Sequence, residues 1–173
     1  MEVNVMMDIV LREMKENNIN LEKWSRSSCG HACRGRKIKI PKPVDYDTLG
    51  VCFHEIGHII LGHLDGENGK TRYVEEYEAE MFAIQKLHEY RYYNKRYELR
   101  AKSHVLFKIA QAKNRGHNMK KVPKEIVDWT RFQINKWNKA KKVFVHYGNK
   151  KTEAEVQKAV KLYKQWGNDV IAK

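Results

Sequence analysis

The sequence predicts an α+β fold that is mostly helical, and two observations support this prediction. Most of the chain repeats apolar residues at the spacing of a helix, as Met6, Ile9 and Val10 do near the N-terminus. One short segment, residues 36–40, instead alternates charged and apolar residues as a half-buried or edge strand does. The 173 residues, of which 42% are hydrophobic, fit one domain with a core, or one domain with an appendage.

Caps, prolines and glycines set the bounds of the other predicted elements. Asp45 or Asp47 offers an N-cap to an apolar helix that runs to about Leu61, where a glycine-rich stretch begins. The remaining predictions are helices at residues 6–15, 74–93, 95–114 and 123–142, a helical turn at 20–24, a second short strand at 143–147, and a last helix opening at Thr152.

The residues His54-Glu55-Ile56-Gly57-His58 form an HExxH motif on the predicted apolar helix. Histidines four residues apart project from one face of a helix, so both imidazoles can bind one zinc ion. Glu55 lies about 100° further round the helix axis, where a carboxylate can act as general base for a water that zinc activates. A catalytic zinc normally has three protein ligands, so the motif requires a third.

Two candidates for the third ligand follow in the chain. His63 is the nearer one, but it lies nine residues after His54, whereas the extended HExxHxxGxxH pattern requires ten. The other candidate is a segment with four carboxylates in six residues: Glu75, Glu76, Glu78, Glu80. Such a cluster is unfavourable on a helix unless a positive charge compensates it, as a zinc ion would. The residues therefore favour a glutamate from this segment and leave open which one it is.

The stretches HEIGHIILGH and EYEAEMFA together resemble the ImmA/IrrE-type family of zincin metallopeptidases, which are gluzincin-like and common in bacteria, phages and mobile elements. The resemblance covers about residues 36–85. It implies a minimal zincin-like metalloprotease fold with a small sheet. We expect this metallopeptidase domain at residues 1–115, followed by a basic helical extension at residues 116–173 that packs on it.

The resemblance also implies the roles of individual residues. It predicts a Zn2+ ion bound by His54, His58 and Glu76, with Glu55 as the catalytic base. Glu80 stands where many relatives have Asn or Asp, so it either orients a zinc-bound histidine or replaces Glu76 as the ligand.

Two further segments acquire expected roles from the same resemblance. In zincins an edge strand lies over the active-site helix and pairs with an extended substrate, which makes residues 36–40 a candidate for that strand. The alternative is an ordinary edge strand blunted by its charged residues. His104, on the predicted helix at residues 95–114, is a candidate donor to the transition state, or a surface or core histidine without that role.

The net charge of +13 is unevenly distributed. Residues 1–85 contain 11 Lys and Arg against 14 Asp and Glu, whereas residues 86–173 contain 23 against 7, a net charge of +16. So basic a half predicts a nucleic acid or an acidic protein as partner, or a solvated face without one.

The main functional prediction is a zinc metallopeptidase that cuts a specific intracellular protein. The alternatives are a nucleic-acid-associated protein, or an inhibitor module of a phage or mobile element with a retained zinc site.

Three cysteines, an odd number, predict reduced thiols in a cytoplasmic protein. Cys29, His31 and Cys33 form an alternative, weaker candidate for a second metal site. The first residues are charged and contain no apolar stretch typical of a signal peptide, and no segment is long enough to span a membrane. We therefore expect no contact with a membrane. The metallopeptidase prediction makes a protein the expected substrate.

Overall fold

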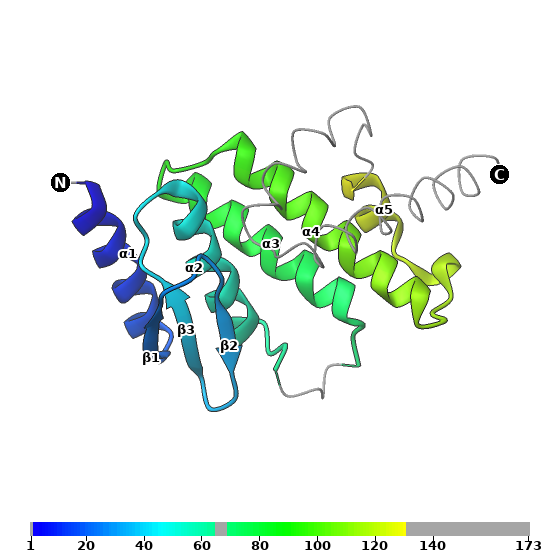
Figure 1. The fold of residues 1–173 in the computed structure, drawn as a ribbon, viewed down its shortest axis with the longest axis horizontal. Coiled ribbons are helices and arrows are strands. Elements are labelled where there is room, and N and C mark those ends of the chain that lie inside the picture. Colours follow the sequence, from blue (N-terminus) through cyan, green and yellow to red (C-terminus); the bar gives the residue numbers. More distant parts are fainter. Residues whose placement is uncertain (1, 65–68, 131–173) are drawn as a thin grey trace. The chain divides into compact units, whose positions relative to one another are not determined.

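The computed structural model describes residues 2–64 and 69–130 of the chain. The chain divides into two compact units, Met1–Glu98 and Leu99–Lys173, and the division falls inside helix α4 (Lys95–Asn114). The described elements are mostly helical and include one three-stranded sheet, as the α+β prediction requires (Figure 1). From the sequence we expected a boundary between residues 115 and 116, where a zincin-like domain ends and its basic extension begins. That boundary stays a prediction.

The first unit begins with helix α1 (Glu2–Glu16), which includes the predicted helix at residues 6–15. Three strands follow: β1 (Asn20–Ser25), β2 (His31–Cys33) and β3 (Lys37–Pro41). Their order in the sheet is β1-β3-β2, with β1 parallel and β2 antiparallel to β3.

Two sequence predictions about this sheet are wrong. Residues 20–24 were expected to form a helical turn, but they form β1, because residues 20 to 25 pair with β3 along most of its length. Residues 36–40 were predicted as a half-buried or edge strand and do form a strand, β3, but it lies in the centre of the sheet and not at the edge. Ile38 and Ile40 of β3 are fully buried, and β1 and β2 form the two edges of the sheet.

Helix α2 (Tyr46–Ile60) is the central element of the first unit, since it contacts α1, β2, β3 and α3. Asp45 caps its N-terminus: the Asp45 carboxylate accepts a hydrogen bond from the Thr48 amide at 2.7 Å, and the Thr48 hydroxyl accepts one from the Asp45 amide at 3.1 Å. All twelve residues from Thr48 to Ile59 are buried. The polar residues of the HExxH motif therefore lie inside the protein.

Helix α3 (Arg72–Glu89) packs along α2, and its N-terminal half carries the acidic cluster. A salt bridge to α1 holds its other half, because Lys86 Nζ lies 2.8 Å from the buried Glu13 carboxylate. The first turn of α4 follows and ends the unit at Glu98.

In the second unit, the described part consists of the rest of α4, a short 3-10 helix at Met119–Lys121 and helix α5 (Lys124–Thr130). The helix predicted for residues 123–142 is thus described only to Thr130. Its remainder, the predicted strand at 143–147 and the helix predicted from Thr152 lie outside the described residues. None of the helices in the described ranges is long and apolar enough to cross a membrane.

Candidate metal centre

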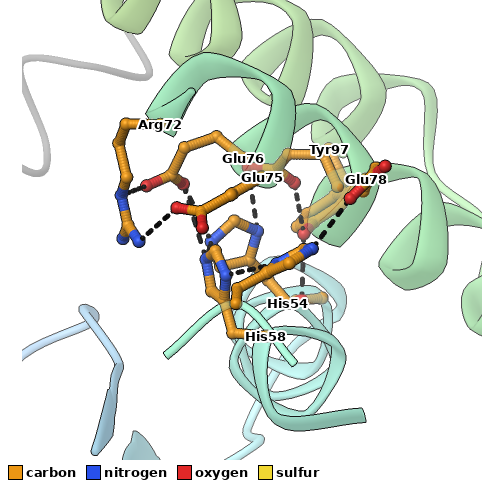
Figure 2. Close-up of polar contacts among 10 residues, drawn as sticks. His54, His58, Arg72, Glu75, Glu76, Glu78 and Tyr97 are labelled. Atoms are coloured by element: carbon orange, nitrogen blue, oxygen red, sulfur yellow. Dashed lines mark hydrogen bonds and ion pairs between the residues drawn. The ribbon is translucent and has the colours of Figure 1, made fainter. Parts of the chain in front are cut away.

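Helices α2 and α3 bring two imidazoles and one carboxylate together inside the first unit (Figure 2). Nε2 of His54 lies 3.1 Å from Nε2 of His58, one helical turn away. Oε2 of Glu76, on α3, lies 3.3 Å from the first of these atoms and 3.6 Å from the second. All three residues are buried, with relative exposures of 7%, 2% and 1%.

The separations of these three donor atoms fit a tetrahedral metal ion. Ligands at about 2.0–2.1 Å from a zinc ion lie about 3.3–3.4 Å from one another in a tetrahedron. The observed distances of 3.1, 3.3 and 3.6 Å scatter around that value. His54, His58 and Glu76 could therefore hold a metal ion without a large rearrangement.

Glu80 lies at the opposite edge of the His54 ring. Its Oε1 atom lies 3.4 Å from Nδ1 of His54, while its Oε2 atom lies 2.8 Å from the Tyr97 hydroxyl. The Tyr97 ring reaches this position because Gly50 has no side chain: a Cβ there would stand 2.1 Å from the ring. This arrangement places Glu80 where it can orient His54, and places Glu76 where both Nε2 atoms point.

Arg72 holds the second oxygen of Glu76. Its Nε atom lies 2.7 Å from Oε1 of Glu76, and its guanidinium also contacts Glu75 at 3.3 Å (Figure 2). Because one carboxylate oxygen faces the guanidinium, the other is directed toward the histidines. Arg72 thus orients Glu76 for binding a cation through a single oxygen.

Glu55 lies against the segment that leads into the edge strand β2. A Cβ atom added to Gly30 would stand only 2.4 Å from Cγ of Glu55, so the loop before β2 lies directly on this side chain. Strand β2 also packs against α2, the helix that carries Glu55. Burial raises the pKa of Glu55, with a smaller opposing effect from His54. A raised pKa brings a carboxylate closer to the range in which a general base exchanges protons at neutral pH.

The surroundings of the two motif histidines shift their pKa values in opposite directions. Burial acts to lower the pKa of His54, but the Glu80 and Glu76 carboxylates outweigh it and raise the pKa to about 10. Burial dominates at His58 and lowers its pKa to about 4. The carboxylates thus create a strongly negative site that attracts a cation, whether a proton or a metal ion.

His63, the sequence alternative for the third ligand, does not reach the three donor atoms. It is buried, and its Nδ1 atom lies 2.9 Å from Nδ1 of His58, on the side of that ring opposite Nε2. The backbone turn at the end of α2 determines the position of His63. The residue spacing of the HExxHxxGxxH pattern does not describe this turn. His104 lies on α4 in the second unit, and its predicted role stays a prediction.

Several residues of the site were not identified from the sequence. Tyr97, Arg72 and Gly30 have no motif around them, and only the packing of α2, α3 and the loop before β2 shows their role. Among the described residues, Cys29, His31 and Cys33 do not form a group close enough to share a metal ion.

Comparison of the chain with protein-family models, with curated protein sequences and with solved structures gave no significant match.

Proposed function

We propose that the protein is a zinc-dependent metallopeptidase that hydrolyses a peptide bond in a protein substrate. The observation that carries the proposal is the convergence of His54 Nε2, His58 Nε2 and Glu76 Oε2 at tetrahedral separations beside the buried carboxylate of Glu55. A structural zinc site would need four protein ligands and no base. Three ligands and a neighbouring carboxylate are the composition of a hydrolytic site.

The donor set favours zinc over the other common divalent ions. Calcium and magnesium prefer oxygen ligands in larger numbers, whereas two imidazoles and one carboxylate suit zinc. When bound, zinc would supply Lewis-acid chemistry, since it lowers the pKa of water and polarises a carbonyl group. His54, His58 and Glu76 would hold it, while Glu80 and Arg72 would keep His54 and Glu76 in position.

Glu55 would move the protons of the reaction. Its carboxylate would accept a proton from the attacking water and later deliver it to the amine of the leaving product. The close contact at Gly30 would hold the carboxylate in one place during both transfers. The raised pKa of Glu55, caused by burial, favours this double use as base and then acid.

The substrate would bind along β2. An extended peptide can add to a sheet only at an edge, and β2 is the edge strand that packs on α2 and follows Gly30, the residue next to Glu55. This assignment replaces residues 36–40, which lie in the central strand. The HExxH motif, the glutamate helix and the small sheet together support a zincin-like fold of the ImmA/IrrE type for the first unit.

Metal analysis of the full-length chain tests the zinc site, and a peptide library from a proteome digest tests the hydrolysis. We expect one zinc ion per chain, and none in the His58→Ala variant. The Glu55→Gln variant keeps the shape of the side chain but removes the base, so zinc should stay while cleavage falls about 100-fold or more. Equal cleavage by wild type and Glu55→Gln would overturn the proposal. An unchanged biological effect of Glu55→Gln would favour the inhibitor module.

A further inference from the structure

His63 connects the metal centre to a chain of polar side chains that ends at the protein surface. Nδ1 of His63 lies 2.9 Å from Nδ1 of His58, and Nε2 of His63 lies 2.9 Å from Oε2 of Glu78. Both oxygens of Glu78 lie 2.8 Å from Nζ of Lys70. The side chain of His63 is fully buried, whereas those of Glu78 and Lys70 are partly exposed.

The end of helix α2 creates the contact between the two histidines. The amide of His63 donates to the carbonyl of His58 at 3.0 Å, and the amide of Gly62 donates to that of Ile59 at 3.3 Å. Gly62 has a φ of +68°, in the left-handed region that favours glycine. This pair of bonds is a Schellman motif, which brings the side chain just after the glycine against the residue five positions earlier.

The chemistry of these polar side chains determines which atom donates each hydrogen bond and which atom accepts it. Glu78, paired with Lys70, is a carboxylate and accepts a hydrogen bond, so Nε2 of His63 must donate. With a single hydrogen on its ring, His63 has none on Nδ1, and this atom accepts from Nδ1 of His58. The reverse order would place an imidazole lone pair against the Glu78 carboxylate at 2.9 Å, two acceptors facing each other.

We infer that His63 is a positioning residue for the metal centre: together with Glu78 it holds His58 in the tautomer whose Nε2 atom carries the lone pair. This inference rests on the proposed zinc site, to which His58 contributes Nε2. It assigns to His63 neither ligation nor contact with the substrate. Glu80 acts on Nδ1 of His54 from α3, and His63 acts on Nδ1 of His58 from the end of α2.

Two substitutions at position 63 separate hydrogen bonding from packing. His63→Phe keeps a planar ring but removes both nitrogens, so the Nδ1 hydrogen of His58 loses its acceptor. His63→Asn places an amide oxygen near the position of Nδ1 and can restore that acceptor. Glu89→Gln serves as the control, because Glu89 lies on the same helix as Glu78 and contacts Lys86.

Zinc affinity of the full-length chain, measured by competition with a chromophoric chelator, is the first readout. We expect His63→Phe to weaken zinc binding about 10- to 100-fold, as changes beside metal ligands usually do. His63→Asn should recover most of this loss, Glu78→Gln should weaken binding, and Glu89→Gln should leave it unchanged. If His63→Phe and Glu78→Gln bind zinc like the wild type, the inference is wrong.

The tautomer of His58, read from nitrogen-15 NMR of the imidazoles, is the second readout. In the wild type, Nδ1 of His58 should carry the hydrogen, and in His63→Phe both tautomers should be populated. If the wild type binds zinc, but His58 in the zinc-free protein carries its hydrogen on Nε2, the inference is wrong and the proposed function is unaffected. A wild-type protein that binds no zinc would overturn the proposed function, and the inference with it. If His63→Phe does not fold, His63→Asn and Glu78→Gln decide by the same two measurements.

Discussion

Gly30 lies so close to Glu55 that a single methyl group would not fit between them. A Cβ atom at position 30 would stand 2.4 Å from Cγ and 2.8 Å from Oε1 of Glu55. Real Cβ atoms do not approach other atoms this closely, so either the Glu55 side chain or the segment that carries Gly30 must shift if Gly30 is replaced. The loop before β2 therefore determines where the proposed catalytic base can stand.

We predict that Gly30→Ala lowers peptide cleavage about 10-fold or more, because small displacements of catalytic groups have large effects on rate. Zinc content should stay at one per chain, since none of the three proposed ligands is touched. The cleavage assay should be repeated in a Glu55→Gln background. There, Gly30→Ala should have no further effect, and a further loss would mean that Gly30 acts through something other than Glu55.

Glu76 and Glu80 can be distinguished by metal analysis. We predict that Glu76→Ala loses stoichiometric zinc, because it removes one of the three donor atoms. Glu80→Ala should keep a weaker site, with zinc affinity reduced about 10- to 100-fold, because Glu80 contacts the other nitrogen of His54. Zinc content after desalting and chelator competition measure the two effects. Full zinc in Glu76→Ala together with its loss in Glu80→Ala would reverse the assignment.

Cys52 should resist thiol reagents in the folded protein. It is fully buried, its thiol donates to the Pro41 carbonyl at 3.3 Å, and burial raises its pKa. A raised pKa leaves less of the reactive thiolate at any given pH. In a Cys29→Ser/Cys33→Ser variant, we predict no labelling at pH 8 without denaturant and complete labelling after unfolding. Rapid labelling of the folded variant would show that α2 opens readily near the metal centre.

The net positive charge of residues 86–173 leads to a separate prediction about nucleic-acid binding. If residues 86–173 bind nucleic acid, affinity should fall steeply with salt, because association releases counterions. Reversing Lys139, Lys141 and Lys142 to Glu, at positions outside the described residues, should weaken binding to all sequences alike. Peptide cleavage should be unaffected. A titration of DNA and RNA at low salt that shows no binding would leave an acidic protein as the expected partner of this half.

The elements with strong local signals were predicted well from the sequence. Helix α4 occupies the predicted residues 95–114, and Asp45 caps α2 as one of the two predicted candidates. Of the three short strands, only β3 was predicted as a strand, at residues 36–40. Strand β1 was taken for a helical turn and β2 was not predicted, because these strands of six and three residues acquire their conformation from pairing with β3.

The sequence by itself determined the chemistry available to this protein. His54, Glu55 and His58 stand at helical spacing, so any helix through them places both imidazoles on one face and the carboxylate beside them. The excess of glutamate in residues 75–80 likewise predicted a partner of opposite charge.

Only the tertiary structure decided which atoms meet. The packing of α3 on α2 brings Glu76 to both Nε2 atoms and leaves Glu80 at the far side of His54. The pairing of β2 with β3 places Gly30 on Glu55. These contacts join residues from separate elements, and their distances depend on how the elements pack, which periodicity within one element does not specify.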